Sequence, residues 1–367
     1  MSILSIFNIG KERYPALTGV RAVGAAAVFF NHLPFLLGFR FTVDVIVLFF
    51  VLSGFLIVYI YYRTTPGSSL NLFNYFVNRF ARIYPVYFLI VSIAIYCNHD
   101  FRPLLLFKNY TLTHSLFHNI KDVLVQPSWS LTVEECFYLL APLIMLLIRK
   151  FNYYVSLAFA VVLLLIALMI SIGPFSFLHT PKFVFDTTFF GYFFAFYAGV
   201  WLALLILNKE KEGSVKRKGI AFTLAGSAGT LLALGTMAYI YLFPVGENFW
   251  TWICLNNFIL PVPVTALYFG LITENTLLAR VLSGKIFGLL GRTSYAFYLL
   301  HQLFIDLIAL PYLQKYFDGH HNLFVIASFI MVQILALLIF VFYEEPLNKL
   351  IRSKVKLRSN NGIKQTS

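Results

Sequence analysis

The chain has 367 residues, of which 60% are hydrophobic and only 12% are charged, and its formal net charge is +13. Soluble domains contain roughly 45–50% apolar residues, so this composition excludes an ordinary soluble protein and indicates an integral membrane protein. Basic loops on one side of a membrane account for the positive charge, and we expect no nucleic-acid partner.

Ten apolar runs along the chain are each about as long as a helix that crosses a bilayer. The sequence therefore predicts an all-α, polytopic membrane bundle with about ten transmembrane helices. Pro261 and Pro263 predict a kink or break in the eighth run. The runs occupy residues 15–39, 43–62, 83–97, 131–148, 153–173, 183–207, 220–243, 251–272, 286–311 and 322–343.

Two stretches beside the third run are less regular. The run at 83–97 is short, and the amphipathic stretch 71–85 before it is a candidate for the start of the same helix. The segment 98–130 after it is long, polar and contains three histidines. We expect this segment to fold back in part toward the membrane.

Lysine and arginine residues predict the orientation of the chain. With both termini cytoplasmic, 20 of the 28 basic residues fall in inside regions and 6 in outside regions. Basic residues concentrate in cytoplasmic loops, so this split favours a multi-pass protein of the cell (inner) membrane with both ends inside. Residues 1–346 then form the membrane domain, and the basic, polar residues 347–367 are expected to be a disordered cytoplasmic tail.

The first run contains two ionisable residues, Arg21 and His32. Eleven residues turn through about 1100° at about 100° per residue, so both side chains return to nearly the same helix face. Their Cα atoms would lie roughly 16 Å apart along the axis. Because an ionisable residue inside a membrane span marks a functional site by default, this face predicts a site with a permanent cation near one membrane edge and an imidazole deeper in.

Arg79 and Arg82 stand one helical turn apart at the cytoplasmic entry to the third run. Two guanidinium groups at this spacing can converge on one phosphate. Contact with lipid head groups is the other interpretation. Spacing alone leaves both open.

Ser128, Ser130 and Glu134 lie at the outer entry to the fourth run. Ser130 and Glu134 are four residues apart and share a helix face. Ser128 is a candidate helix cap, which would be a purely structural role. A carboxylate that enters an apolar run needs a partner, and Glu134 with a histidine would form an acid–base or orienting pair.

Tyr295, Tyr298 and His301 are spaced by three in the ninth run, so they share one side of a helix. The pattern fits either a polar cavity or a histidine whose hydrogen bonds are made within the packed helices. His114 and His118 are four residues apart, a spacing that allows two metal ligands on one helix face. No carboxylate stands beside them in the sequence, so we expect no metal site.

Six segments occur in an order that resembles the acyltransferase-3 superfamily of integral membrane acyltransferases, which modify bacterial surface sugars and related molecules. The resemblance covers about residues 13 to 346. The segments are LTGVRAVGAAAVFFNH, DVIVLFFVLSGFLI, NRFARIYPVYFL, PSWSLTVEECFYLLAPL, GRTSYAFYLLHQ and YEEPLNKL.

The resemblance implies roles for the residues singled out above. Arg21 and His32 match a motif tied to use of an acyl donor, with His32 as the catalytic base. As a mechanistic hypothesis beside the resemblance, Glu134 would orient or stabilise the His32 imidazolium. Arg79 and Arg82 match a motif that helps to hold the phosphate-rich donor. The resemblance places Ser128, Ser130 and Glu134 near the reacting groups, and Tyr295, Tyr298 and His301 match a late motif that would line the acceptor site or cavity. No fused extracytoplasmic SGNH domain is expected.

The implied activity is that of an acyltransferase for groups other than amino-acyl groups. An acetyl group would pass from cytoplasmic acetyl-CoA, or another acyl-CoA, to a hydroxyl of an extracytoplasmic or lipid-linked sugar. Acyl-CoA is then a co-substrate, and no permanently bound cofactor is expected. The bilayer, a glycan acceptor and surface-polysaccharide assembly proteins are the expected partners. A transporter or flippase without chemistry is the alternative, and direct transfer and an acyl-histidine intermediate both stay open.

Overall fold

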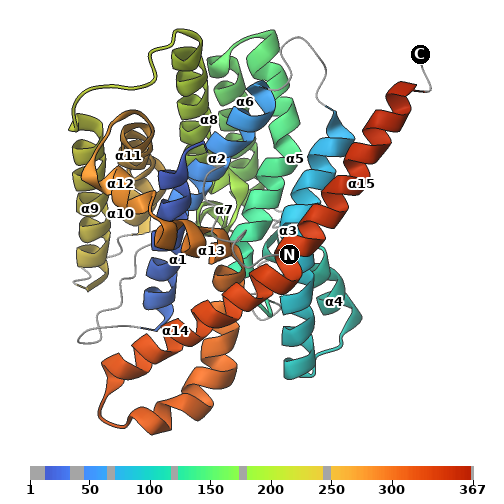
Figure 1. The fold of residues 1–367 in the computed structure, drawn as a ribbon, viewed down its shortest axis with the longest axis vertical. Helices are drawn as coiled ribbons and strands as arrows, with labels where there is room; N and C mark the ends of the chain where they lie inside the picture. The colour runs from blue at the N-terminus through green and yellow to red at the C-terminus, as the bar shows by residue number, and fades with distance from the viewer. Residues whose placement is uncertain are drawn as a thin grey trace.

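The computed structural model describes residues 13–33, 45–63, 71–116, 123–172, 180–242 and 249–364. Over these ranges the regular elements are α-, 3-10 and π-helices, with no β-strand. The predicted all-α fold is therefore confirmed. In Figure 1 most helices lie side by side, and α14 and α15 run along the lower edge and across one flank.

The chain forms its helices in the following order. They are α1 (Pro15–His32), α2 (Ile46–Arg63), α3 (Leu72–Asn98), α4 (Pro103–Tyr110), η2 (His114–Leu116), η4 (Gln126–Ser128), α5 (Trp129–Lys150), α6 (Tyr153–Ile172), α7 (Pro181–Thr187), α8 (Phe189–Lys211), α9 (Ala221–Leu242), α10 (Phe249–Ile253), η6 (Cys254–Ile259), α11 (Pro261–Thr273), α12 (Leu277–Leu282), α13 (Lys285–Phe304), η7 (Ile305–Leu313), η8 (Gln314–Phe317), α14 (His321–Ile339), η9 (Phe340–Glu344) and α15 (Glu345–Lys364).

Within the described ranges, eight helical stretches are long and apolar enough to cross a membrane, judged by length and composition. They coincide with the third to tenth predicted runs, and they make the chain a multi-pass membrane protein. The first two predicted runs form α1 and α2, which do not belong to this group, and residues 34–39 and 43–44 of those runs lie outside the described part. The count of ten thus stays a prediction.

The third and eighth runs show the irregularities that the sequence predicts. α3 begins at Leu72, so the amphipathic stretch is its first part, and the Asn71 side chain caps it by accepting a hydrogen bond of 3.0 Å from the Asn74 amide. Before Pro261 the chain changes from the α-helix α10 to the π-helix η6. The change fits the missing amide hydrogen of proline, which removes a helical hydrogen bond.

The segment after α3 packs back against the bundle through α4, η2 and η4. The Tyr87 hydroxyl donates a hydrogen bond of 2.6 Å to the carbonyl oxygen of Asn109, and the Asn109 side chain is fully buried. Residues 117–122, including His118, lie outside the described ranges.

The structure describes a helix over part of the tail at 347–367, which the sequence predicts to be disordered. α15 continues as a helix to Lys364, and residues 365–367 are outside the described part. Its first turn is stabilised by an ion pair of 2.7 Å between Lys349 and Glu345, and the helix packs along α3 (Figure 1). The expectation of disorder came from polar composition, which carries no information about this tertiary contact.

The closest helix pairs are α2 with α8, α1 with α13, and α9 with α11. In the first pair, two glycines allow the backbones to approach. A Cβ atom on Gly54 would collide with the carbonyl oxygen of Phe196, and one on Gly199 with that of Val51. Because lipid tails do not drive helices together as water does, such close backbone packing supplies much of the association energy. This contact fixes α2, and with it one wall of the cavity described next.

Candidate functional site

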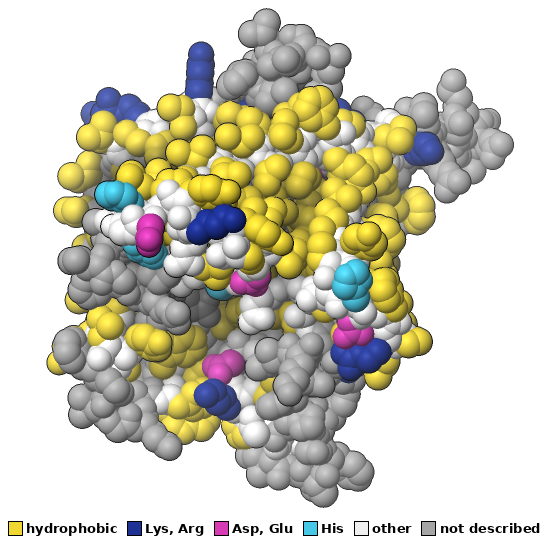
Figure 2. All heavy atoms as spheres, turned by 90° about the horizontal axis from the view of Figure 1, so that it is seen from below, with side chains coloured by type: hydrophobic (Ala, Val, Ile, Leu, Met, Phe, Trp, Pro, Cys, Tyr) yellow, Lys and Arg dark blue, Asp and Glu magenta, His cyan; other side chains and the backbone are white. Residues whose placement is uncertain are grey.

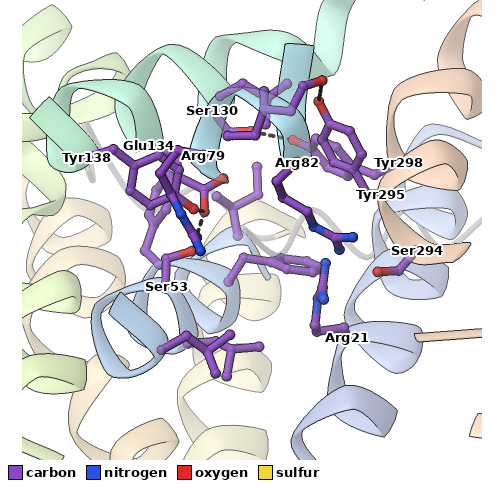
Figure 3. Close-up of a pocket in the computed structure, with 17 residues that line it drawn as sticks. Arg21, Ser53, Arg79, Arg82, Ser130, Glu134, Tyr138, Ser294, Tyr295 and Tyr298 are labelled. Atoms are coloured by element: carbon purple, nitrogen blue, oxygen red, sulfur yellow. Dashed lines mark hydrogen bonds between the residues drawn. The ribbon is translucent and has the colours of Figure 1, made fainter. Parts of the chain in front are cut away.

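A cavity of about 120 Å³ lies inside the bundle between α1, α2, α3, α5 and α13 (Figure 3). Its walls combine apolar side chains with a concentrated polar set. The polar lining residues are Arg21, Ser53, Arg79, Arg82, Ser130, Glu134, Tyr138, Ser294, Tyr295 and Tyr298. Three arginines and one carboxylate therefore face one small cavity.

The three arginines enter the cavity from two helices. Figure 3 shows the guanidinium groups of Arg21 and Arg82 pointing toward one another. Arg21 forms no hydrogen bond or ion pair with the described part of the chain, whereas Arg79 lies between two rings, 5.5 Å from the centroid of Tyr61 and 5.4 Å from that of Tyr138. Since Arg79 and Arg82 line an internal cavity, the arrangement favours anion binding over contact with lipid head groups.

Arg82 is held by a carboxylate that the sequence reasoning missed. Its Nη1 lies 3.0 Å from Oε1 of Glu344, and the Glu344 side chain is only 2% exposed. Glu344 belongs to η9, in the closing segment YEEPLNKL, so the pair joins α3 to the other end of the chain. A buried ion pair of this kind fixes geometry, and loss of one partner leaves an uncompensated charge.

Glu134 is anchored by two hydroxyls and not by a histidine. Oε1 of Glu134 accepts hydrogen bonds from the hydroxyls of Ser53 on α2 and Tyr138 on α5. Ser53 and Tyr138 were also missed by the sequence reasoning, although Ser53 stands in the quoted segment VLSGFLI and Tyr138 lies four residues after Glu134. The expected pair of Glu134 with His32 is not formed.

Ser130 connects α5 to α13. Its hydroxyl lies 2.7 Å from the Tyr298 hydroxyl, and Tyr298 in turn donates a hydrogen bond of 2.9 Å to the carbonyl oxygen of Pro127. Tyr295 donates a bond of 2.8 Å to the carbonyl oxygen of Ile83. The late-run tyrosines thus line the cavity and hold α13 against its neighbours.

Ser128 lies at the start of α5 but does not cap it with its side chain. Its hydroxyl donates to the carbonyl oxygen of Val125 at 2.6 Å and lies 3.0 Å from Nε2 of His114. Burial lowers the pKa of His114 to about 4, so this histidine is neutral at physiological pH. The structure therefore corrects the capping interpretation: Ser128 instead ties the outer segment to α5, and it does not line the cavity.

His32 and His301 form a second cluster, where α1 ends against α13. Nδ1 of His301 lies 2.6 Å from the carbonyl oxygen of Tyr298, and Nδ1 of His32 lies 2.9 Å from that of Val28. A carbonyl can only accept, so both Nδ1 atoms carry hydrogen. With hydrogen on Nδ1, Nε2 of the fully buried His301 can accept a hydrogen bond, and it faces Nδ1 of His32 at 3.4 Å.

This arrangement fixes the chemistry available to His32. With hydrogen on Nδ1, the neutral imidazole has its free lone pair on Nε2. The His32 residue is exposed among the residues that the structure describes. Neutral imidazole with an oriented Nδ1 and a free Nε2 is the form required of a general base.

The end of the molecule at which α1 finishes is shown in Figure 2. Hydrophobic side chains cover much of this face, and a few acidic, basic and histidine side chains are scattered among polar and backbone atoms. Neither His32 nor His301 lines the arginine cavity. The described ranges contain no group of three or more His, Cys, Asp and Glu side chains that could hold a metal ion.

Apolar helices around an arginine-lined cavity, with a histidine pair at one helix end, define a polar site in a multi-pass membrane protein. A family model described as "Acyltransferase domain" matches residues 14–342. The chain belongs to this family, acyltransferase-3, as its ordered segments predict.

The similar proteins include O-acetyltransferases. The chain is 34% identical over 161 residues to the peptidoglycan O-acetyltransferase OatA of Listeria monocytogenes. The aligned region covers 38% of this chain and 25% of that protein. It is 25% identical over 367 residues to the O-acetyltransferase OatA of Staphylococcus aureus, covering 91% of this chain and 57% of that protein. The chain thus spans little more than half the length of the Staphylococcus relative. No solved structure matches it.

Proposed function

We propose that this protein is a membrane O-acetyltransferase. It moves an acetyl group from acetyl-CoA, bound from the cytoplasmic side, to a hydroxyl of an extracytoplasmic or lipid-linked sugar. The names of the Listeria and Staphylococcus relatives support acetyl transfer to a hydroxyl.

The observation that carries the proposal is the meeting of three arginines in one cavity that has a single lining carboxylate. Such a site suits a polyanion, because guanidinium groups form charge-assisted hydrogen bonds with phosphate. Coenzyme A has phosphates at one end and a thioester at the other. Phosphates held near Arg21 would leave the thin pantetheine arm to extend along α1 toward His32.

The proposed reaction uses His32 as a general base. Nε2 of His32 removes the proton of the sugar hydroxyl as its oxygen attacks the thioester carbonyl. The C–S bond breaks, an ester C–O bond forms, and the proton passes from the imidazolium to the departing thiolate. Glu134 acts in the cavity by holding Ser53 and Tyr138, since it does not contact His32.

Acetyl-CoA binding to the purified full chain in lipid nanodiscs tests the donor site. Arg21→Gln should weaken binding about tenfold or more, because it removes one charge-assisted contact. Arg280→Gln is the matched control, since Arg280 is an exposed arginine of α12 that does not line the cavity. Equal affinities of the two variants would contradict the proposed donor site.

Acetyl transfer is tested in cells with and without the protein. Mass spectrometry of the surface polysaccharide should find a mass increase of one acetyl group only when the protein is present. Absence of any acetyl-CoA-dependent product would favour a transporter without chemistry.

A further inference from the structure

A second hollow, of about 530 Å³, lies between α6, α8, α9 and α11. None of its lining residues lines the arginine cavity. Its wall is apolar along most of its length, and Trp201, which lines it, is 45% exposed. The groove therefore opens to the surroundings of the helices, which in a multi-pass protein are lipid.

The α8 wall of the groove is one continuous stripe. Phe194, Ala198, Trp201, Leu205 and Lys209 follow one another at intervals of four, three, four and four residues. These intervals keep the side chains on one helix face. At about 1.5 Å per residue the stripe is roughly 22 Å long, which exceeds one leaflet of a hydrocarbon core of about 30 Å. The groove thus matches one acyl chain and the start of a head group.

Two cations stand at one end of this stripe. Lys209 ends the α8 row, and the Arg217 guanidinium lies 4.9 Å from the ring centroid of Phe222 and 6.0 Å from that of Phe269. Neither cation forms an ion pair with the described residues. Both belong to the set of basic residues that the sequence predicts to be cytoplasmic.

The carboxylates beside these cations are occupied elsewhere. Glu210 accepts hydrogen bonds from Tyr14 at 2.6 Å and Tyr59 at 2.7 Å, and it pairs with Arg13. Glu274 accepts from the amides of Phe222 and Thr223 at 2.9 and 2.8 Å. Burial opposes ionisation of Glu274, but these hydrogen bonds and the nearby positive charge of Arg217 keep its pKa below the ordinary value. The groove therefore ends in two cations, of which Arg217 is partly compensated by the nearby charge of Glu274.

We propose that this groove binds one anionic phospholipid of the surrounding bilayer. The phosphate lies between Lys209 and Arg217, and an acyl chain follows the stripe past Leu205 and Trp201. Basic residues at the end of an apolar groove between membrane helices complement such a lipid in both charge and length. Since α8 also packs closely on α2, bound lipid would stabilise a wall of the cavity.

Fluorescence quenching of Trp201 tests the proposal in the purified full chain, in detergent micelles. Phospholipids with brominated acyl chains quench a tryptophan that they touch. Phosphatidylglycerol should quench the fluorescence at concentrations at least tenfold lower than phosphatidylcholine with the same chains. Trp201→Phe should remove the saturable component of the quenching. Equal quenching by the two lipids would overturn the proposal.

Charge variants locate the head group. Lys209→Gln with Arg217→Gln should weaken phosphatidylglycerol binding by roughly 10- to 30-fold and leave phosphatidylcholine unchanged. Lys211→Gln with Lys218→Gln is the matched control, because it removes the same charge from the same connection without touching the groove. If both double variants lose phosphatidylglycerol affinity equally, the lipid is attracted by general surface charge, and the site is rejected.

A further variant protects the test against misfolding. If the double variant does not elute as a single species in gel filtration, the single Lys209→Gln variant replaces it, with an expected loss of about fivefold. Unchanged phosphatidylglycerol affinity in a well-folded variant would reject the site. The measurement is independent of acetyl transfer, so its failure leaves the proposed function untouched.

Discussion

The two ends of α1 lie in different environments and carry different functional groups. Arg21 faces a cavity inside the bundle, together with two further arginines that are held by Glu344 and by tyrosine rings. His32 is exposed, and its Nδ1 lies between a carbonyl oxygen and a second imidazole. The first end offers fixed positive charge, and the second offers a lone pair. In the proposed function, one helix separates the donor's anionic end from the base.

The largest effect should follow removal of the lone pair. His32→Ala should lower acetyl transfer by about 10²–10⁴-fold, the usual contribution of a general base, and leave acetyl-CoA affinity unchanged. Acetyl content of the surface polysaccharide and acetyl-CoA binding measure the two effects. His320→Ala is the control, and normal transfer by His32→Ala would refute the proposed division of labour.

The fixed charge of the cavity can be tested through stability. Arg82→Met should destabilise the protein by about 3–5 kcal/mol, because it leaves Glu344 buried without its partner. Adding Glu344→Gln should restore part of the loss. Thermal unfolding in detergent measures both variants. Arg102→Met, at an exposed ion pair with Asp100, should have no measurable effect. A similar loss in both arginine variants would show that burial of the pair is irrelevant.

The rigidity of the cavity wall rests on the close approach of α2 to α8. Gly54→Ala should cost about 1–3 kcal/mol of stability, because the new methyl group meets the backbone of Phe196. Gly235→Ala introduces the same atom into open space on α9 and should be neutral or slightly stabilising. Comparable unfolding temperatures for the two variants would contradict the close packing.

The smallest expected effect concerns the orientation of His32. His301→Phe keeps a ring among Phe29 and Phe297 but removes the acceptor that faces Nδ1 of His32. It should lower kcat about tenfold with little change in the KM for acetyl-CoA, and His301→Gln, which retains an acceptor, should restore part of the rate. A change confined to KM would place His301 in donor binding.

The sequence predicted the helical class, the approximate position of most helices and the irregularity before Pro261. Apolar length and proline chemistry are local properties, so they can be read without a tertiary structure. It also predicted that Arg21, Arg79, Arg82, Ser130, Glu134, Tyr295 and Tyr298 are special, and all seven line one cavity. Helical spacing and the cost of polar groups in lipid carried that information.

Only the tertiary structure decided which residues are partners. The sequence suggested a histidine for Glu134, and the fold gives it Ser53 and Tyr138 from different turns and helices. It offered no partner for Arg82, and the fold supplies Glu344 from 262 residues away. From composition, residues 347–367 were expected to be disordered. The structure describes the helix α15 in this region, and α15 contacts α3. Composition and periodicity fix which side chains are costly to bury. The packing of distant helices determines which group compensates each of them.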